Sequence, residues 1–418
     1  MNILVVTKAS WDDRIASGNT LSNFFEGWED AKFYCIYARE AMPQNRVCEE
    51  YYAISPISII KKLFNPQNIG RRFSVSSTHM RQNTSNEVKL IDKAKRYKVF
   101  FELLYNCAYG SCLWKNRAFK KFIQDSNPDI VFCFGQSDPL TYYTLKYVKK
   151  NTSARIISYY VDDLYRCNTS TFNLLQRGKN NRLMAIARMS DRCYAISERM
   201  CDEYKKLYRK PFYLLHKGCD ISQPKAKVNS PIKFVYAGNL FYHRDRILVS
   251  LANVINQIND GGLKAHLDIY SGTSVSKDTF VSLNIKGAST LHKARPFDEI
   301  KQIMTEADVV LHVESFDEEQ MKVVRLSFST KITDCMQSGS MMLAIGPDSV
   351  ASIDYSRKIP GCVVVNDLND MIDVVRALID NPAIIVENAI KTNEYARKNV
   401  EIVQLRNRLK SEFESLID

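Results

Sequence analysis

The chain has 418 residues, of which 45% are hydrophobic and 25% are charged. This composition is typical of a globular protein and excludes a disordered or fibrous one, while the length favours two domains over one. No run approaches the roughly 18 uncharged apolar residues of a membrane helix. Residues 1–7 indicate a strand without a basic leader, so we expect a cytoplasmic chain.

The formal net charge of +12 is concentrated in one part of the chain. Residues 1–200 hold 30 Lys and Arg against 18 Asp and Glu, whereas residues 201–418 hold 28 of each kind. Residues 51–150 alone hold 17 basic and 6 acidic side chains. A basic region in an otherwise neutral protein indicates a negatively charged partner, which could be an anionic membrane surface, a lipid-linked phosphate or nucleic acid.

Cysteine and histidine exclude several kinds of site. The 11 cysteines show no Cys-x-x-Cys or Cys/His ligand spacing, so the sequence predicts neither a disulfide framework nor a metal site. The six histidines form no HExxH motif and no Ser/His/Asp order, and there is no Walker loop. These patterns argue against a hydrolase triad, a zinc protease and a P-loop enzyme, and we expect no cofactor.

The first domain is predicted over residues 1–218, where short apolar runs alternate with segments of helical spacing. Strands are predicted at 3–7, 31–38, 129–135, 154–161, 192–197 and 212–217. Helices are predicted at 20–28, 115–125, 142–151 and 198–208. A basic insertion is predicted near 58–98, because the polar stretch 65–98 fits no strand or helix. The aromatic segment 99–114 that follows could lie on a membrane surface.

The second domain is predicted over residues 232–395, after a polar linker at 219–231. Strands are predicted at 232–239, 265–272, 309–315, 341–345 and 362–365. Helices are predicted at 245–257, 296–307, 330–338 and 367–380, with a last pair from 382 onward. The helix at 396–418 could return to the first domain. The pattern therefore predicts an α/β protein with two open parallel-sheet domains that face each other across a cleft.

The turn after the strand at 232–239 is one candidate site, because doubly wound sheets bind ligands beyond the carboxyl ends of their strands. Gly238 lets the backbone approach a ligand closely, and Arg244 stands near a helix start that favours phosphate. His243 precedes that arginine. A tight turn with solvated arginines is the alternative.

The start of the helix predicted at 330–338 is a second candidate. Ser327, Ser329 and Thr330 are residue types that cap helices, so hydroxyls and free N–H groups could hold a diphosphate. Lys331 would supply the counter-charge. Asp334, about one turn further on, could accept both hydroxyls of a ribose. Simple capping explains the serines, but it explains Lys331 and Asp334 less readily.

Two candidates lie in the first domain. Asp162 and Asp163 end a predicted strand and could bind a sugar hydroxyl or a cation, with helix capping as the alternative. Gly18, followed by Asn19, is expected in the turn after the first strand, facing the same cleft. A plain turn is the alternative there.

At these residues the sequence resembles the GT-B glycosyltransferases, specifically the retaining family-four enzymes of bacterial capsule, O-antigen and exopolysaccharide assembly. The resemblance covers essentially the whole chain and is most specific at 325–339 and 342–347, where that family holds the nucleotide diphosphate and ribose. The other segments that carry it are 1–7, 194–198, 215–220, 234–240 and 307–315.

The resemblance implies roles for individual residues. Asp334 falls on the family's ribose-binding carboxylate, which is usually Glu. The first glutamate of the Glu-x7-Glu motif falls on Leu326, and Glu314 could supply a carboxylate from a different place. The family's pyrophosphate-binding Arg and Lys fall on Asn239 and Arg244, so Lys331 could replace the lost charge.

Further correspondences concern the loop and the first domain. Phe328 lies within the donor-binding loop 327–330. The family's paired glycines in the first domain are reduced to Gly18, and its histidine has no counterpart near 134–135.

The resemblance implies metal-independent, retaining transfer of a sugar from a nucleotide diphosphate sugar to a lipid-linked or oligosaccharide acceptor. Arg244 and Lys331 would stabilise the leaving diphosphate, and Asp162 and Asp163 would complete the catalytic set. A GT-B-like sugar-nucleotide epimerase and a non-catalytic basic scaffold on a membrane or nucleic acid are the alternatives.

The basic region 51–150 would then hold the first domain on the inner face of the cytoplasmic membrane, and no nucleic-acid partner is expected. Each basic side chain near an anionic surface could add up to about 1 kcal/mol. The candidates are Lys61, Lys62, Arg71, Arg72, Lys93, Lys95, Arg96 and Lys98.

Overall fold

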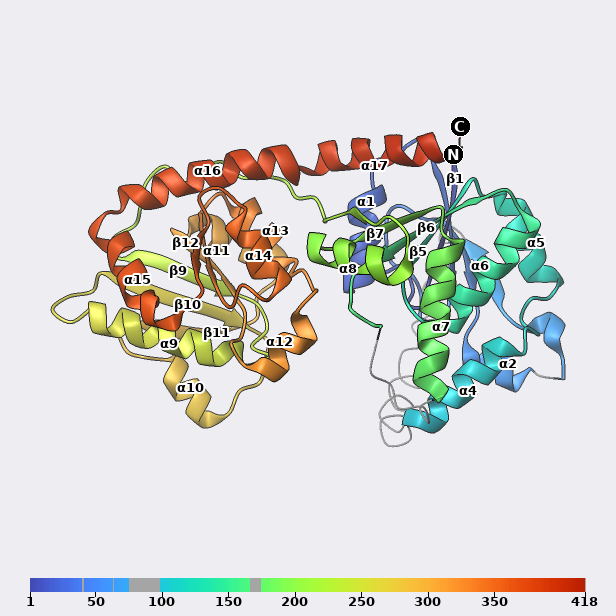
Figure 1. The fold of residues 1–418 in the computed structure, drawn as a ribbon, viewed down its shortest axis with the longest axis horizontal. Coiled ribbons are helices and arrows are strands. Elements are labelled where there is room, and N and C mark those ends of the chain that lie inside the picture. Colours follow the sequence, from blue (N-terminus) through green and yellow to red (C-terminus); the bar gives the residue numbers. More distant parts are fainter. Residues whose placement is uncertain (40, 63, 75–97, 166–173, 418) are drawn as a thin grey trace. The chain divides into compact units, whose positions relative to one another are not determined.

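The computed structural model describes residues 1–39, 41–62, 64–74, 98–165 and 174–417. The chain forms two compact units, one made of residues 1–215 together with the segment from 406 onward, and one made of residues 216–405 (Figure 1). Each unit has one sheet with helices packed against it. None of the described helices has both the length and the apolar character that crossing a membrane requires.

The first unit contains an eight-stranded sheet in the order β4-β3-β2-β1-β5-β6-β7-β8. All neighbouring strands are parallel except β3 and β4. The chain moves outward from β1 to one edge and then returns to the other side of β1, so the strand order reverses between β1 and β5. The strands are β1 (Asn2–Thr7), β2 (Lys32–Tyr37), β3 (Glu50–Ala53), β4 (Arg71–Ser74), β5 (Ile130–Phe134), β6 (Arg155–Tyr160), β7 (Arg192–Ala195) and β8 (Tyr213–Leu214).

Part of the predicted insertion is folded into this sheet, which corrects the prediction for residues 65–74. Strand β4 pairs antiparallel with β3, and the Tyr51 and Phe73 rings stack with their centroids 5.5 Å apart. Arg72 forms ion pairs with Glu50 and Asp125. A four-residue edge strand with two arginines lacks the apolar alternation that marks a strand in sequence. Residues 75–97 of the predicted insertion, including Lys93, Lys95 and Arg96, lie outside the described residues.

The helices of the first unit include two that the sequence analysis did not predict, α2 and α7. The aromatic segment 99–114, for which a place on a membrane surface was considered, forms most of α4 and the turn after it. The helices are α1 (Ala16–Phe25), α2 (Pro56–Lys61), α4 (Lys98–Gly110), α5 (Arg117–Ser126), α6 (Pro139–Asn151), α7 (Leu174–Met189) and α8 (Glu198–Tyr208), with a 3-10 turn at Pro66–Asn68.

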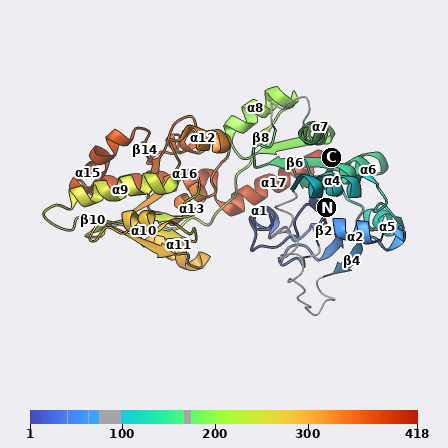
Figure 2. The same ribbon diagram turned by 90° about the horizontal axis from the view of Figure 1, so that it is seen from below.

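The end of the chain packs against α1 of the first unit. Helix α17 (Ile402–Ile417) lies beside α1 in both views (Figures 1 and 2). Its Arg406 donates a hydrogen bond to the Asn23 carbonyl at 2.9 Å. Its Phe413 is buried, with ring centroids 6.0 Å from Phe25 and 5.5 Å from Trp28. The first unit is therefore built from both ends of the sequence.

The second unit contains a six-stranded, fully parallel sheet in the order β11-β10-β9-β12-β13-β14. Its core is mainly aliphatic, includes the buried Phe234 and Tyr236, and lies between the sheet and the helices. The strands are β9 (Ile232–Ala237), β10 (Ala265–Ser271), β11 (Ser289–Lys293), β12 (Val309–Val313), β13 (Met341–Ile345) and β14 (Val363–Val365). The helices are α9 (Arg244–Ile258), α10 (Lys277–Leu283), α11 (Phe297–Glu306), α12 (Glu318–Val324), α13 (Lys331–Ser338), α14 (Ala351–Arg357), α15 (Met371–Asp380) and α16 (Ala383–Asn399).

Three features of the second unit differ from the predicted pattern. The short helices α10, α12 and α14 were not predicted. Strand β11 was not predicted, because Leu291 is the one aliphatic residue among its five. Residues 219–231, predicted as a linker, pack within the second unit, where the Ser222 and Lys225 N–H groups donate to the Gln337 and Gly339 carbonyls.

Candidate functional site

The strand order of the second unit reverses between β9 and β12. From β9 the chain proceeds outward to β10 and β11, and then returns to place β12 on the other side of β9. In open α/β sheets a ligand crevice is expected outside the carboxyl ends of the strands at such a reversal. Strand β9 ends just before Gly238, and β12 ends just before Glu314. Most of the donor-site residues predicted from the sequence lie around these two strand ends.

Arg244 and Glu314 form a buried ion pair at this position. Arg244 is the first residue of α9 and is 6% exposed, and Glu314 is 2% exposed. The Arg244 Nη2 atom lies 3.0 Å from Glu314 Oε1 and 2.8 Å from Oε2, while Nε donates to the Val313 carbonyl at 3.0 Å. Because both partners are buried together, the carboxylate neutralises most of the arginine's charge.

The same arginine orients Asn239. Arg244 Nη1 donates to Asn239 Oδ1 at 2.8 Å, so the amide oxygen faces the arginine. The Asn239 side chain is exposed, and its NH2 group is left to donate elsewhere. The residue at the position of the family's arginine therefore offers a neutral, positioned donor.

A buried histidine borders the ion pair. His312, on β12, is 1% exposed, and its Nε2 lies 3.7 Å from Glu314 Oε1. Burial holds the pKa of His312 well below its usual range, and the charges of Arg244 and Lys331 act in the same direction. This ring is therefore neutral at physiological pH and adds no charge to the site. Ser352 of α14 donates to Glu314 Oε1 at 3.4 Å.

Lys331, the first residue of α13, lies directly over Gly238. A Cβ atom added at Gly238 would stand 2.2 Å from Lys331 Nζ and 2.1 Å from Cε, so this approach requires glycine. Lys331 Nζ donates to the Tyr236 hydroxyl at 3.1 Å. Burial lowers the pKa of Lys331 to about 8, and the Arg244 charge contributes to the lowering. Within the described part of the chain, no carboxylate lies within ion-pair distance of this ammonium.

The segment that leads into α13 carries Ser327, Phe328, Ser329 and Thr330. Thr330 is the N-cap residue, and its side chain makes no capping hydrogen bond. The first N–H groups of a helix lack partners within the helix and favour an anion. Phe328 is buried and stacks on the His216 ring, with centroids 4.1 Å apart. The aromatic stack anchors this segment.

Asp334 lies on the first turn of α13, as the spacing predicts. Burial raises the pKa of its carboxyl group, while Lys217 and Lys331 act to lower it. Burial also lowers the pKa of Lys217, and Asp334 opposes that effect. The Lys217 ammonium and the Asp334 carboxylate therefore each favour the charged form of the other, against the effect of burial.

His243 lies at the N-cap of α9, beside Arg244. Tyr242 and His243 both have left-handed backbone conformations, with φ of 62° and 58°. His243 Nδ1 is 3.5 Å from Asp317 Oδ2, and the Tyr242 ring centroid lies 5.3 Å from the Arg244 guanidinium carbon. Such a backbone is uncommon for side chains larger than glycine and often marks a functional turn.

In the first unit, Asp162 and Asp163 follow β6, as predicted. Asp163 Oδ1 accepts a hydrogen bond from the Tyr204 hydroxyl at 3.1 Å, and the Asp162 carbonyl lies 3.3 Å from the same hydroxyl. Asp162 is the more exposed of the two residues. The two carboxylates differ in environment, because that of Asp163 is held by α8, whereas partial burial raises the pKa of the Asp162 carboxyl group.

Gly18 and Asn19 lie inside α1, which corrects the expectation of a turn at Gly18. The turn is formed earlier, where Asp12 accepts from the Arg14 guanidinium at 2.7 Å. A Cβ atom at Gly18 would lie 2.1 Å from the Asp12 carbonyl oxygen, so glycine is needed for close packing of the helix against this turn. The first helical turn was missed because Ala16 to Asn19 has little apolar periodicity.

Three residues of the donor region were not singled out from the sequence: His312, Tyr236 and Lys217. Both His312 and Tyr236 lie in strands whose neighbours are apolar, so they could not be distinguished from core positions. Lys217 lies in the segment 215–220, where the resemblance gave a local signal. Among the residues that the structure describes, no group of three or more His, Cys, Asp or Glu could hold a metal ion.

Comparison with solved structures finds proteins of the same architecture. HepE of Anabaena, solved in complex with UDP, is 12% identical, with a TM-score of 0.62 over 99% of this chain and 100% of its own. The trehalose-6-phosphate phosphatase N-terminal domain of Candida albicans is 11% identical, with a TM-score of 0.63 over 99% and 96%. The fold is that of the GT-B glycosyltransferases.

A third structure agrees with this result over the full length. Sucrose-phosphate synthase of Thermosynechococcus elongatus is 11% identical, with a TM-score of 0.60 over 100% of this chain and 99% of its own. No sequence-family model matches the chain, and no curated protein matches it by sequence. At these identities the likeness shows the GT-B fold.

Proposed function

We propose that the protein is a glycosyltransferase that binds a nucleotide diphosphate sugar on the second unit and transfers the sugar to an acceptor bound by the first. The observation that carries this proposal is the Lys331 ammonium, which lies over Gly238 at the reversal of strand order and, among the residues that the structure describes, has no carboxylate within ion-pair distance. A half-buried cation beside a helix start is suited to an anionic group such as a diphosphate.

The diphosphate would interact with three kinds of donor. Lys331 would supply the charge, the N–H groups at the start of α13 would supply the helix dipole, and the Asn239 amide would supply a neutral hydrogen bond. Arg244 acts mainly as a positioning residue in this account, because Glu314 already neutralises it. This assignment refines the catalytic role expected for Arg244 from the sequence.

The ribose would bind at Asp334. A carboxylate on the first turn of α13 can accept hydrogen bonds from two neighbouring hydroxyls, and the charge of Lys217 opposes the rise that burial causes in its pKa. HepE, which shares the fold, was solved with UDP and with UDP and glucose. Those complexes support a nucleoside diphosphate as the ligand class.

In the proposed reaction the bond between the anomeric carbon and the diphosphate oxygen breaks, and its electron pair passes to the diphosphate. The acceptor hydroxyl oxygen forms the new bond on the same face, and its proton passes to the leaving diphosphate, which gives retention. Lys331 stabilises the charge that develops on the diphosphate, so the step needs no metal ion. Asp162 and Asp163 would bind the acceptor saccharide, which we propose is lipid-linked and serves polysaccharide assembly.

The test is sugar transfer from labelled nucleotide sugars to extracted lipid-linked acceptors. We expect transfer that persists in EDTA, and a product whose anomeric configuration, read by NMR, matches that of the donor. Lys331→Ala should abolish most of the transfer, whereas Lys277→Ala, an exposed lysine of α10, should leave it unchanged. Interconversion of the donor sugar without an acceptor would instead identify an epimerase and contradict the proposal.

A further inference from the structure

The first unit has an exposed apolar surface formed by α2, the loop after it, and the start of α4. Helices α2 and α4 pack against each other in the structure (Figure 1). On α2 and its loop, Ile60 is 44% exposed and Phe64 is fully exposed. On α4, Val99, Leu103 and Leu104 are exposed. We call these five residues the α2–α4 surface.

The exposed residues of α4 share one side of the helix. Val99 and Leu103, four positions apart, lie on one helical stripe, and Leu104 lies next to Leu103 around the helix, which widens the apolar face. The opposite side is bound to the core, where Tyr109 is buried and donates to the Ile54 carbonyl at 2.7 Å. Glu102 pairs with Lys179 of α7 at 2.6 Å, which fixes the helix from the side. The stripe is therefore held in place on a rigid helix.

Basic residues border this surface on the side of α2, whereas Glu102 of α4 is already paired with Lys179. The sequence contains no Asp or Glu between positions 51 and 86. Lys61 and Lys62, at the end of α2, are exposed. The two lysines line a hollow of about 510 Å³ together with Phe64, Asn65, Gln67, Asn68 and Gly70. Cationic and amide donors around a hollow suit an anionic headgroup.

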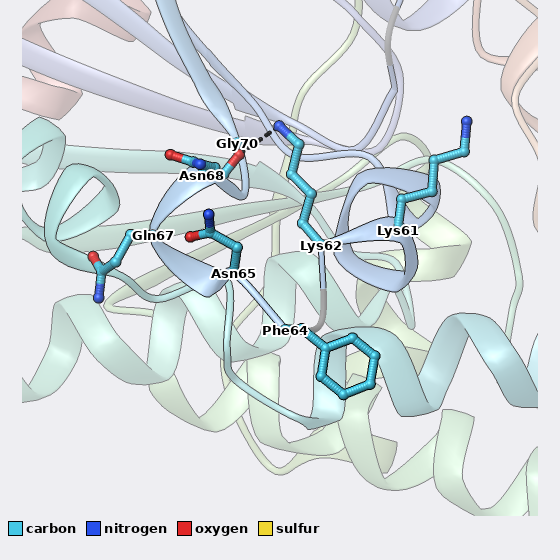
Figure 3. A pocket seen from close by; sticks show the side chains of 7 residues that line it. All are labelled: Lys61, Lys62, Phe64, Asn65, Gln67, Asn68 and Gly70. Atoms are coloured by element: carbon cyan, nitrogen blue, oxygen red, sulfur yellow. Dashed lines mark hydrogen bonds between the residues drawn. The ribbon is translucent and has the colours of Figure 1, made fainter.

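Lys62 and Phe64 point in different directions, which suits a partner with separate polar and apolar layers, such as a bilayer. Figure 3 shows Lys62 extending toward Asn68, whose carbonyl accepts its hydrogen bond at 2.6 Å, while the Phe64 ring points away from that ammonium. An aromatic ring that enters the acyl boundary, with lysines that reach back to the phosphates, matches how amphipathic side chains lie in a bilayer interface.

We propose that the α2–α4 surface docks on an anionic lipid bilayer, with Phe64 and the α4 stripe in the interface and Lys61 and Lys62 on the headgroup phosphates. An apolar patch with a basic border favours a membrane over a second copy of this chain, since a second copy would bring the same positive charge to the contact. The proposal extends the proposed function, because a lipid-linked acceptor is presented at such a surface.

The test is sedimentation of the full chain with vesicles of phosphatidylcholine alone or with one quarter phosphatidylglycerol. We expect binding to the anionic vesicles, weakened at least fivefold by Phe64→Ser, by Leu103→Ser with Leu104→Ser, and by Lys61→Gln with Lys62→Gln. The lysine variant should also lose most of the salt dependence. Equal binding by all variants, or no binding by the wild type, would overturn the proposal.

Matched controls come from the second unit. Phe280→Ser and Lys277→Gln change an exposed aromatic and an exposed lysine of α10, and they should bind vesicles as the wild type does. Sedimentation velocity of the same variants without lipid tests the rival occupant, because a dimer that Phe64→Ser dissociates would assign the surface to a second copy and overturn the proposal. Nucleoside diphosphate binding is measured separately by calorimetry, so its failure would affect the proposed function and leave the vesicle result standing.

Discussion

Arg244 and Glu314 form a bidentate ion pair with almost no exposure to solvent. The arginine also donates hydrogen bonds to the Val313 carbonyl and to Asn239 Oδ1. The pair supplies rigidity to the two strand ends where the order of the sheet reverses. Because its charges cancel, Lys331 is left as the main source of positive charge beside Gly238. Arg244 therefore positions neighbouring groups, whereas Lys331 binds the ligand, and the predictions for the two residues differ.

Breaking the buried pair should cost stability. Arg244→Met or Glu314→Leu alone should lower the free energy of unfolding by about 3–5 kcal/mol, because each leaves an uncompensated buried charge. The double variant should recover most of this loss. Arg357→Met, which breaks the half-exposed pair of Arg357 with Asp348, should cost no more than about 1 kcal/mol. Urea denaturation measures all four, and a double variant as unstable as the sum of the singles would contradict the account.

Nucleotide affinity should depend on pH through Lys331. Its pKa of about 8 means that the ammonium is present at pH 7 and mostly lost at pH 9. Diphosphate binding should therefore weaken about tenfold over that range. Calorimetry at the two pH values measures this change.

The contribution of Lys331 to the stability of the ligand-free protein depends on pH in the opposite direction. A lysine whose pKa falls on folding contributes stability as pH rises through 8, so weaker binding at pH 9 would not reflect unfolding by this group. Lys331→Arg keeps its charge and should show a flat binding profile. A flat profile in the wild type would show that Lys331 does not titrate in the site.

Gly238→Ala should displace the Lys331 ammonium. The new Cβ would occupy the place of Nζ and Cε, and the end of a lysine can swing away at little cost to stability. Loss of a charged hydrogen bond of about 1.5–3 kcal/mol predicts at least about tenfold weaker diphosphate binding. Adding Lys331→Ala to Gly238→Ala should weaken binding no further. Additive losses would show that the glycine acts on the ligand by another route.

The packing of α17 on α1 can be tested by Phe413→Ala. Removing a ring that is enclosed by Phe25 and Trp28 should lower the free energy of unfolding by about 3–5 kcal/mol. Phe280→Ala, an exposed phenylalanine, should change it by less than about 0.5 kcal/mol. Diphosphate affinity, which belongs to the second unit, should be unchanged at temperatures where the variant is folded. Equal stability of the two variants would contradict the packing.

Sequence patterns predicted the long central strands well, because β1, β5, β9 and β12 are mostly apolar and mostly buried, with the exposed Lys233 in β9 and the buried His312 in β12 as interruptions. They missed β3, β4 and β11, which are short, carry polar or charged side chains and lie at or next to the edges of the sheets. They also failed at Gly18, because the reason for that glycine is a contact with Asp12 that no local pattern contains.

The candidate site shows the same division. Lys331 and Asp334 could be singled out because they follow a capping segment at helical spacing. The pairing of Arg244 with Glu314 joins positions 70 residues apart, so the sequence offered both residues without the charge balance between them. Because Glu314 neutralises Arg244, Lys331 is the cation that remains available to a ligand. The pairing of β9 with β12 brings Arg244 and Glu314 together, and the sequence does not show this pairing.

The most direct test of the central claim is a calorimetric titration of the purified full chain with UDP, GDP, ADP and CMP. The account predicts that at least one nucleoside diphosphate binds, that Lys331→Ala and Asp334→Asn each weaken this binding at least about tenfold, in line with the loss of a charged hydrogen bond, and that Lys277→Ala leaves it unchanged. If no nucleotide binds the wild type, or if Lys331→Ala binds as tightly as the wild type, the second unit does not hold a diphosphate at this site.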